Sequence, residues 1–330
     1  MLFFPRDFIE KHLTMEECID AVELCFRHIH TGEGFHALRR RVHLPGGIIG
    51  WGNLLSMMPG YYDSNYFGGK VFSVYPDNTG GPLPTHQGLV LLFDSHNGSL
   101  LACADAHAIT EIRTGAASAL ATKLLSRPDS RWAAFIGAGT QAWSHLDSIM
   151  AVRNIDKITI YNRTLPRAQR FQAHILEKYG IEARICASSK EACLGADIVC
   201  TATTAGEPVL HMADIAPGTH INAVGACAPC FRELSSELVK AGRFFGDCRE
   251  AIMNESGDFL IPISEGEYNE EHFCGDLSDI VGGVAGRETR DEITIFKSLG
   301  IANEDIAAIR LLYERYKDSD CPEILRIDGV

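Results

Sequence analysis

The chain has 330 residues and a formal net charge of −13, and 46% of its residues are hydrophobic. This length suits two domains with a sizeable buried core. The acidic balance argues against a nucleic-acid partner, which would require a basic face. No apolar run has the length of a membrane span, and Arg6 and Asp7 interrupt the N-terminal apolar residues too early for a signal peptide. We therefore expect neither a membrane segment nor a secretory leader.

The N-terminal part of the sequence predicts a β-rich segment between two helices. Residues 8–31 have apolar positions at helical spacing, and Thr14 with Glu17 resembles a capping box within them. Residues 38–93 alternate short apolar runs with Pro- and Gly-containing turn clusters, which indicates strands joined as hairpins. An Ala-rich helix is then expected over residues 109–125.

The middle of the chain alternates predicted strands and helices, which is the pattern of a doubly wound parallel sheet. The expected strands are residues 132–136, 157–161, 182–186, 197–202, 219–224 and 243–247. A polar, Gly-rich passage follows at 254–292, and residues 302–317 predict a last amphipathic helix. The fold class is therefore α/β, with a Rossmann-type doubly wound parallel sheet and a second, β-rich α+β domain.

The turn after the first strand of this sheet carries a G-x-G-x-x-A pattern made by Gly137, Gly139 and Ala142. Gly137 permits a turn that a Cβ would obstruct, Gly139 lets backbone N–H groups approach a pyrophosphate, and Ala142 lets the helix pack closely on the strand. Thr140 and Gln141 begin that helix, whose N-terminus would face the negative charge. The pattern alone also fits a turn without function. A strand, turn, helix and second strand within about 30 residues favour dinucleotide binding.

The end of the second strand indicates which dinucleotide is bound. An NAD site places Asp or Glu there to accept hydrogen bonds from the ribose 2′-hydroxyl. This chain has Asn162, Arg163 and Thr164 instead, a guanidinium and two neutral hydrogen-bonding side chains that suit a 2′-phosphate. The alternative is that Arg163 only solvates the start of a helix. We predict NADP(H) as the preferred cofactor, with NAD(H) as the alternative.

The 11 cysteines are scattered and odd in number, which indicates free thiols in a reducing compartment and a cytoplasmic protein. Cys227 and Cys230 form a C-x-x-C pattern, but no second pair has zinc-site spacing and the surrounding sequence does not resemble a thioredoxin-like unit. The 13 histidines likewise show no metal-ligand spacing. We expect no metal site.

Motifs along almost the whole chain resemble those of the ornithine cyclodeaminase/μ-crystallin family. They lie at residues 57–60, 69–71, 84–87, 109–117, 137–142, 161–164, 224–225, 232–234 and 296–300. The resemblance implies that residues 1–125 with 302–330 form a substrate-binding and dimerisation domain and that residues 126–301 form the Rossmann domain. It also implies a homodimer, for which the apolar strands of the β-rich segment offer surface to a second copy.

Members of this family bind a small amino or imino acid over the nicotinamide and transfer hydride at the carbon that bears nitrogen. The resemblance places Arg41, Lys70 and Arg113 around the substrate, and three cations can fix the position of an α-carboxylate. Arg113 is expected to open the helix that follows the β-rich segment. Each cation alone would suit a solvated surface position, and we expect accessible side chains that add little stability.

The resemblance also implies contacts with the nicotinamide half of the cofactor. Thr85 and Arg113 would reach it, and three residues would line the nicotinamide side: Thr203, Val224 and Ser298. Ligands in such sheets bind outside the carboxyl ends of the strands. The strand ends before Thr203 and at Val224 should therefore face the cofactor.

The sequence departs from the cyclodeaminases of the family at Cys227, where those enzymes carry an Asp that handles the protons of the amino group. Their reaction must deprotonate an amine twice, and neither Glu111 nor Glu233 can be placed in the pocket from sequence. Reducing a preformed imine requires delivery of one proton, which Lys70 or a water can provide. The reductase reaction is therefore favoured.

We predict an NADPH-dependent reductase of a small cyclic imino acid, of the Δ1-pyrroline-2-carboxylate or Δ1-piperideine-2-carboxylate type, or a related amino-acid dehydrogenase. Its candidate catalytic residues are Lys70, Arg41, Arg113 and Cys227. Two alternatives stay open. One is an ornithine cyclodeaminase that forms proline and ammonia, and the other is a non-catalytic protein that binds a small ligand together with NADPH.

Overall fold

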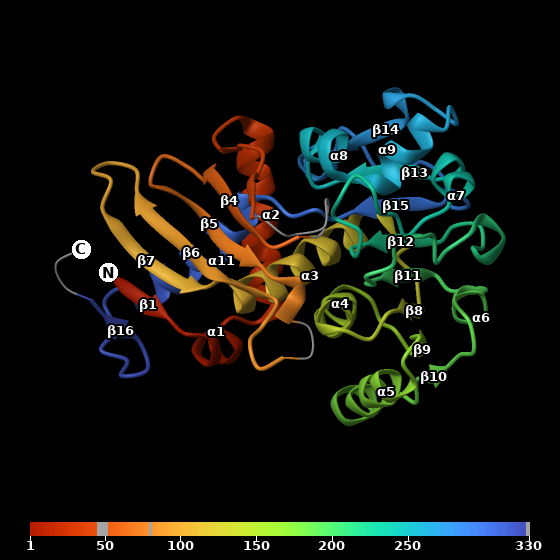
Figure 1. Cartoon of the computed structure of the whole chain (residues 1–330), viewed down its shortest axis with the longest axis horizontal. Coiled ribbons are helices and arrows are strands. Elements are labelled where there is room, and N and C mark those ends of the chain that lie inside the picture. Colours follow the sequence, from red (N-terminus) through yellow and green to blue (C-terminus); the bar gives the residue numbers. More distant parts are fainter. Residues whose placement is uncertain (45–51, 79–80, 328–330) are drawn as a thin grey trace. The chain divides into compact units, whose positions relative to one another are not determined.

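In a computed structural model, residues 1–44, 52–78 and 81–327 are described and the chain divides into two compact units (Figure 1). Unit 1 comprises Met1–Ala116 and Gly300–Val330, and unit 2 comprises Ala117–Leu299. The first division falls inside helix α3 (Ala106–Leu125), whereas the sequence placed a boundary after that helix. One continuous helix thus contributes to both units.

Unit 1 is built on an eight-stranded mixed sheet. Its strands are β1 (Leu2–Phe4), β2 (Phe35–His36), β3 (Arg40–His43), β4 (Leu54–Tyr61), β5 (Tyr66–Val74), β6 (His86–Asp94), β7 (Leu100–Asp105) and β16 (Leu325–Arg326). The order is β16-β1-β7-β6-β5-β4-β2, and β3 pairs with β4 beside that path. All these pairs are antiparallel except β1 with β7. The expected hairpins are present as the pairs β4–β5, β5–β6 and β6–β7.

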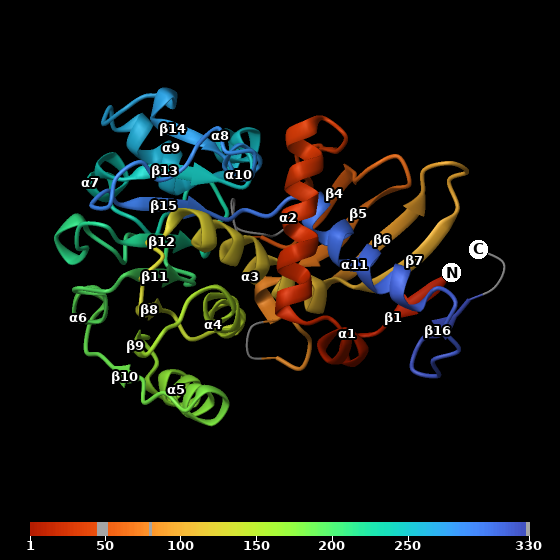
Figure 2. The ribbon, with the colours of Figure 1, turned by 180° about the vertical axis from the view of Figure 1, so that it is seen from behind.

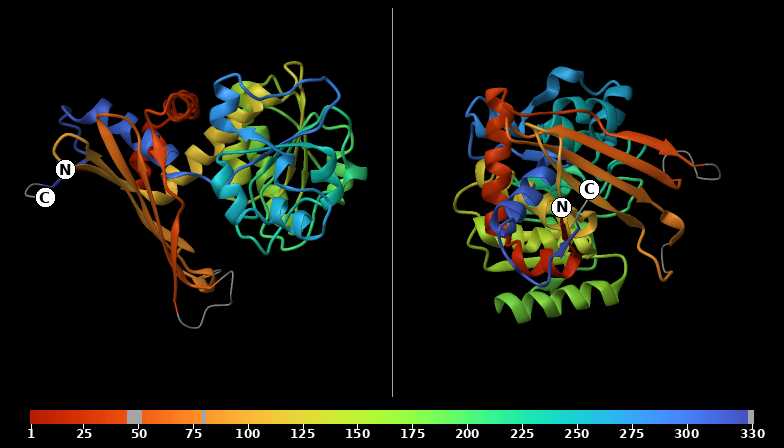
Figure 3. Two further views of the ribbon diagram at one scale, coloured as in Figure 1. Left: turned by 90° about the horizontal axis from the view of Figure 1, so that it is seen from above. Right: turned by 90° about the vertical axis from the view of Figure 1, so that its left-hand side faces the viewer.

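Three helices accompany this sheet: α1 (Arg6–His12), α2 (Met15–Thr31) and α11 (Ala302–Tyr316). The prediction of one helix over residues 8–31 is wrong, because Thr14 begins a new helix there. The Thr14 side chain accepts the Glu17 backbone N–H, and the Glu17 side chain accepts the Thr14 N–H. Helices α2 and α11 lie on one side of the sheet, and α11 packs against β4 to β7 (Figures 2 and 3).

Unit 2 contains a second eight-stranded sheet. Its strands are β8 (Trp132–Ile136), β9 (Lys157–Tyr161), β10 (Arg184–Ile185), β11 (Ile198–Thr201), β12 (His220–Ala223), β13 (Arg243–Gly246), β14 (Phe273–Asp276) and β15 (Thr294–Lys297). The order is β10-β9-β8-β11-β12-β15-β13-β14, and every pair is parallel. The strand order therefore reverses between β8 and β11, which is where doubly wound sheets bind ligands.

All six strands expected in unit 2 are present, and the sequence missed β14 and β15. The helices of this unit are α4 (Thr140–Val152), α5 (Leu165–Tyr179), α6 (Ser189–Cys193), α7 (Ser236–Ala241), α8 (Arg249–Glu255), α9 (Gly257–Ser264) and α10 (Leu277–Val281). Short 3-10 helices lie at Pro76–Asn78, Met212–Asp214 and Glu270–His272. Among the helices of the described residues, none is long and apolar enough to cross a membrane.

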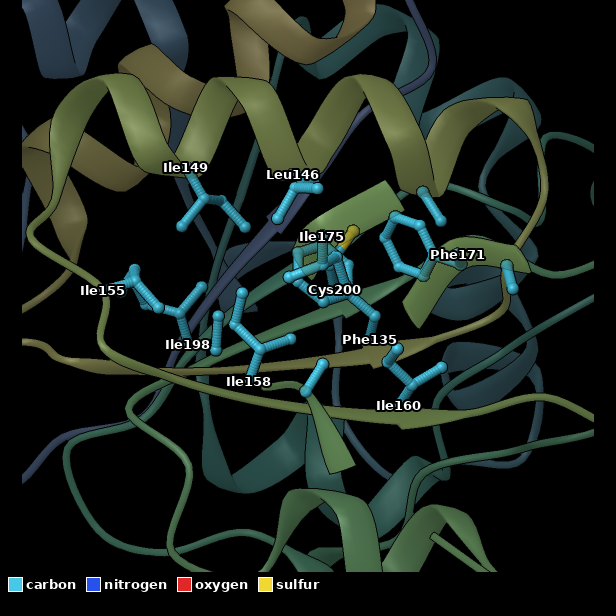
Figure 4. Packing of buried hydrophobic residues seen from close by; sticks show 14 of the residues in the cluster. Phe135, Leu146, Ile149, Ile155, Ile158, Ile160, Phe171, Ile175, Ile198 and Cys200 are labelled. Atoms are coloured by element: carbon cyan, nitrogen blue, oxygen red, sulfur yellow. The ribbon is translucent and has the colours of Figure 1, made fainter. Parts of the chain in front are cut away.

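A large hydrophobic cluster forms where α4 and α5 pack on β8, β9 and β11 (Figure 4). The helices supply Leu146, Ile149, Phe171 and Ile175, and the strands supply Phe135, Ile158, Ile160, Ile198 and Cys200. Fully burying one such aliphatic or aromatic side chain stabilises a fold by roughly 1.5–3 kcal/mol. Ala142, in the first turn of α4, belongs to the same cluster, so this packing fixes the helix N-terminus close to the end of β8.

Candidate active site

The turn between β8 and α4 has the geometry expected of a phosphate-binding turn. Gly137 has a φ of 111°, and a Cβ at this position would lie 2.4 Å from the carbonyl oxygen of Ala202, so only glycine fits. Gly139 caps α4, and a Cβ built on it meets no heavy atom within 4 Å. The space beside the helix N-terminus is therefore open. A pyrophosphate has room to approach the first turn of α4, which contains Thr140 and Gln141.

The residues expected to select the cofactor follow β9. Asn162 donates from its side-chain amide to the carbonyl oxygen of Thr164 at 2.8 Å, which shapes a tight connection to α5. Arg163 is exposed and has no hydrogen bond or ion pair with any described residue. Its guanidinium is therefore available to an external anion. No carboxylate stands among these three residues to repel a 2′-phosphate.

The residues expected beside the nicotinamide follow neighbouring strands of this sheet. Thr203 lies after β11, Val224 directly follows β12 and Ser298 directly follows β15, so parallel strand ends bring them to one edge. Ser298 is buried, and its Oγ has no hydrogen-bond partner among the described residues. An unpartnered buried hydroxyl at this edge fits a polar group of a bound cofactor.

Cys227 lies at the same strand edge. Its Sγ is 3.5 Å from the carbonyl oxygen of Val224 and 3.9 Å from that of Ser298. The thiol is half-buried, while Cys230 is exposed. The structure thus places Cys227, the position at which cyclodeaminases of the family are expected to carry an Asp, next to two of the expected nicotinamide contacts.

The two carboxylates that the sequence could not place have different environments. Glu111 belongs to unit 1, where its carboxylate lies within 4.0 Å of both Arg6 and His107. Glu233 belongs to unit 2, is fully buried and accepts four hydrogen bonds from residues at the ends of β11 and β12. Burial raises the pKa of Glu233, and the Lys297 charge and the hydrogen bonds from Thr203 oppose that shift. Both carboxylate oxygens are already engaged by residues of the same strand ends.

Lys70 and Arg113 come together in unit 1 on a pair of acidic residues that the sequence analysis missed. Lys70 Nζ lies 3.0 Å from Asp305 Oδ1 and 3.0 Å from the hydroxyl of Thr110. Arg113 donates from Nε to the same Oδ1 at 2.9 Å and from Nη1 to Glu304 Oε2 at 2.5 Å. One sequence signal could have revealed this pair. Glu304 and Asp305 are adjacent acidic residues in the first turn of a helix, and the residues around them are apolar.

Two expectations about these cations are wrong. Lys70 and Arg113 are each only 3% exposed, so they are buried ions rather than accessible surface cations. Arg113 lies well inside α3, which begins at Ala106, and does not open that helix. Their burial follows from packing, because α11 covers the sheet face of β5 and places Glu304 and Asp305 against them.

The pKa values of the two cations shift in opposite directions, although burial lowers both. Burial lowers the pKa of Lys70 to about 8, although the Asp305 carboxylate opposes the shift and the Arg113 charge adds to it. Burial also lowers the pKa of Arg113, but Asp305 and Glu304 outweigh it and leave that pKa above its usual value. Lys70 is therefore the cation that can exchange a proton near neutral pH, and Arg113 stays charged.

Arg41 and Thr85 belong to the same unit. Arg41 lies in β3 opposite Ser56 of β4, and Ser56 lies opposite Phe72 of β5, two residues from Lys70. Because side chains alternate along a strand, Arg41 is on the same sheet face as Lys70. Thr85 precedes β6, and its hydroxyl lies 3.0 Å from His86 Nδ1. Arg41 and Lys70 thus share one face of the sheet, and Lys70 and Arg113 of α3 share the Asp305 carboxylate.

The described residues contain no group of three or more His, Cys, Asp or Glu side chains arranged to hold a metal ion. All 11 cysteines lie in the described ranges and are free. The C-x-x-C pair therefore remains two thiols in this structure.

Comparison with known proteins relates the whole chain to one family. A sequence profile described as the Ornithine cyclodeaminase/mu-crystallin family matches residues 3–320. The ketimine reductase mu-crystallin of Rattus norvegicus is 38% identical over 263 residues, which are 79% of this chain and 80% of the relative.

Solved structures of similar proteins share the fold. The Δ1-pyrroline-2-carboxylate reductase of Thermococcus litoralis, solved in complex with NADH and L-proline, is 40% identical with a TM-score of 0.92, over 96% of this chain and 98% of its own. An archaeal alanine dehydrogenase dimer with bound NAD is 30% identical with a TM-score of 0.92, over 99% of both chains. The mixed α/β fold with a parallel sheet is thereby established for this chain.

Proposed function

Because the chain belongs to the ornithine cyclodeaminase/mu-crystallin family, we propose that it is an NAD(P)-dependent reductase of a small cyclic imino acid, of the Δ1-pyrroline-2-carboxylate or Δ1-piperideine-2-carboxylate type. The observation that carries this proposal is the buried Lys70, which holds a proton at a pKa of about 8 and shares Asp305 with Arg113. An imine reductase needs one proton donor of this kind and a binding site for the substrate carboxylate.

Each unit carries residues with a proposed role in this reaction. In unit 1, the substrate carboxylate is bound and oriented by Arg41, Lys70 and Arg113. Charge-assisted hydrogen bonds from such cations are strong and directional, so they fix both position and orientation. The turn after β8 and the strand edge with Ser298 hold the cofactor in unit 2. When bound, a reduced nicotinamide supplies hydride to the imine carbon. Lys70 delivers a proton to the nitrogen, so that the C=N bond becomes a C–N single bond.

The replacement at Cys227 separates this function from a cyclodeaminase. A half-buried thiol beside two backbone carbonyls offers no carboxylate for deprotonating an amine. Glu233, the buried carboxylate nearest in sequence, already accepts four hydrogen bonds. Reduction of a preformed imine does not need such a base, and the same residues also serve a related amino-acid dehydrogenase.

We propose NADP(H) as the preferred cofactor. Arg163 is exposed and unpaired among the described residues, and Asn162 and Thr164 add neutral hydrogen-bonding groups. These three positions suit a 2′-phosphate, whereas an NAD-specific site carries a carboxylate there. The Thermococcus litoralis reductase was solved with NADH, so the preference of this chain is a property to be measured directly.

A homodimer is also proposed, through the face of the unit 1 sheet opposite α11. Strand register places five apolar side chains on this face, each 36–51% exposed: Val42, Leu55, Met57, Val71 and Leu89. Contiguous exposed apolar side chains on a sheet are typical of an interface. The archaeal alanine dehydrogenase of the same fold was solved as a dimer.

We also propose a cytoplasmic location, which the free cysteines support, because thiols stay reduced in the cytosol.

One assay tests the central proposal. Purified protein is mixed with NADPH and either cyclic imine, and oxidation of the cofactor is followed by absorbance together with formation of the cyclic amino acid. Steady NADPH oxidation with one imine is expected. Isotope-labelled ornithine, in a parallel reaction with NAD, should give no proline. Proline without net cofactor consumption would identify a cyclodeaminase, and tight NADPH binding without turnover of any imine would identify a binding protein.

A further inference from the structure

Glu233 ties together the ends of two neighbouring strands of unit 2. Its Oε1 accepts the backbone N–H of Thr203 at 2.8 Å and the hydroxyl of Thr203 at 2.7 Å. Its Oε2 accepts the hydroxyl of Thr201 at 2.9 Å and the backbone N–H of Gly225 at 2.7 Å. Thr201 ends β11, and Gly225 follows β12 by two residues. One carboxylate therefore links the segments that leave both strands.

These segments form part of the strand edge assigned to the nicotinamide. Thr203 and Val224 are two of its expected contacts, and Gly225 directly follows Val224. The fit is close, because a Cβ on Gly225 would lie 2.5 Å from Glu233 Oε1 and 2.2 Å from the carbonyl oxygen of Thr203. Neither segment can shift far without breaking a hydrogen bond to Glu233.

Glu233 is itself held by a buried ion pair. Asp258 Oδ1 accepts the backbone N–H of Glu233 at 2.7 Å and that of Leu234 at 2.9 Å. Lys297, at the end of β15, lies 2.8 Å from Asp258 Oδ2, and both side chains are 0% exposed. This chain of contacts connects β15 with β11 and β12, so three adjacent strand ends are coupled through Lys297, Asp258 and Glu233.

We propose that Glu233 is a positioning residue for catalysis, which fixes the β11 and β12 strand ends so that they support the nicotinamide ring in its reactive orientation. The inference rests on the proposed nicotinamide-dependent function. Glu233 itself touches neither cofactor nor substrate in this scheme. It acts through Thr203 and the backbone at Val224 and Gly225.

The number and type of donors explain why a carboxylate is needed. Two of the four donors are backbone N–H groups, and each oxygen of Glu233 accepts one of them. A backbone N–H can only donate, so each of these groups needs an acceptor oxygen. A glutamine side chain has one acceptor oxygen and one amide NH2 group, which only donates, so it accepts from only one of these two backbone N–H groups. Glu233→Gln keeps the size of the side chain and leaves either Thr203 N–H or Gly225 N–H without an acceptor.

Asp197 provides a matched control at the other end of the same sheet. Its Oδ2 accepts the backbone N–H groups of Arg131 at 2.8 Å and of Trp132 at 3.0 Å, where β8 begins. Asp197 Oδ1 accepts from the Arg127 guanidinium, so Asp197→Asn keeps one oxygen for both backbone N–H groups and removes a charged partner of Arg127 in unit 2. That change lies at the amino ends of the strands, whereas ligands bind at the carboxyl ends.

The test compares wild type, Glu233→Gln and Asp197→Asn in full-length protein. The dissociation constant for NADPH is measured by its fluorescence, kcat and KM by imine reduction, and Tm by thermal unfolding. Glu233→Gln should weaken NADPH binding and lower kcat, each about tenfold, with the KM for the imine changing less. Asp197→Asn should lower Tm and leave the kinetic constants within about twofold.

Several results would overturn the inference. If Glu233→Gln lowers Tm but leaves cofactor binding and kcat as in Asp197→Asn, Glu233 is only structural. Should Glu233→Gln fail to fold, Thr201→Val removes one hydroxyl donor without changing the shape of the side chain, and a smaller change in the same constants is expected. Unchanged constants in Thr201→Val would then reject the role. If wild-type protein binds no nicotinamide cofactor, both the proposed function and this inference are rejected. If wild-type protein is active and Glu233→Gln leaves NADPH binding and kcat unchanged, only the inference is rejected.

Discussion

Lys70 Nζ and Arg113 Nε share one oxygen of a single carboxylate, Oδ1 of Asp305, at 3.0 and 2.9 Å. With Glu304, which also accepts from Arg113, these residues form a buried group of two cations and two carboxylates. Their formal charges cancel. In the proposed reaction, an anionic substrate bound beside them would make the group net negative, which would raise the pKa of Lys70 and hold its proton for transfer to the imine nitrogen.

The pH dependence of imine reduction follows from the buried Lys70. Its pKa is lowered to about 8, chiefly by burial, so the protonated form that can donate disappears as pH rises through that value. We expect kcat/KM to fall on the alkaline side with an apparent pKa near 8, measured with saturating NADPH. Because Asp305 raises the pKa of Lys70, Asp305→Asn should move this limb to lower pH. A limb that stays in place in Asp305→Asn would show that another group titrates.

Lys70 also offers a prediction that separates stability from activity. The side chain is 3% exposed, and its pKa falls from 10.5 in the unfolded chain to about 8 in the fold. Between these two pH values the unfolded state binds more protons than the folded state. The free energy of unfolding therefore rises as pH rises from 8 to 10.5, because Lys70 loses its buried charge. Below pH 8 the buried charge costs the fold about 3 kcal/mol at 1.36 kcal/mol per pKa unit.

We therefore expect Lys70→Met to abolish imine reduction while Tm at pH 7 stays the same or rises. Methionine fills similar volume without a charge, and Asp305 keeps Arg113 as its partner. Enzyme assays and thermal unfolding at pH 7 check both parts. A clear drop in Tm would mean that the hydrogen bonds of Lys70 to Asp305 and Thr110 contribute more than burial of its charge costs.

The glycine-containing turn between β8 and α4 was predictable because its signals are local. Gly137, Gly139 and Ala142 lie within six residues; the backbone requires Gly137, the packing of α4 requires a small residue at Ala142, and Gly139 leaves open space beside the helix N-terminus. The capping box of Thr14 and Glu17 is equally local, although the break that it makes between α1 and α2 was not predicted. Short-range chemistry determines such features before any tertiary contact forms.

The buried charge groups were not predictable, because their partners are distant in sequence. Arg113 and Asp305 are 192 residues apart, and neither segment alone shows that it will be buried. The strand β15 was missed for a related reason, since Lys297 at its end looks like a surface residue until Asp258 is seen beside it. Burial of an ion depends on where its counter-ion folds, which periodicity does not encode.

Arg163 should determine discrimination between the two nicotinamide cofactors. It is exposed and makes no hydrogen bond or ion pair with a described residue, so Arg163→Ala removes no internal contact seen there. Loss of a charge-assisted hydrogen bond to the 2′-phosphate should weaken NADPH binding by roughly 1.5–3 kcal/mol and leave NADH binding almost unchanged. Fluorescence titration with both cofactors measures the difference. Equal weakening of both would place Arg163 against the adenine or ribose rather than a phosphate.

The apolar face of the unit 1 sheet supplies the last prediction. Met57 lies opposite Val71, and Val71 lies opposite Leu89, so the three side chains form a row across β4, β5 and β6 on the face that α11 does not cover. Each is more than a third exposed in the single chain. Burial against a second copy would remove this surface from water, which stabilises an interface by roughly 25 cal/mol per Å².

A charge in the middle of that row should prevent association. We expect Val71→Glu to convert a wild-type dimer into a monomer, because a buried carboxylate without a partner is strongly unfavourable at an interface. Sedimentation velocity measures the change in mass. Leu176→Glu is the matched control, since Leu176 is an apolar residue of α5 in unit 2 that is 51% exposed and lies outside this face. A wild type that is already monomeric, or a Val71→Glu variant that remains dimeric, would contradict the proposed interface.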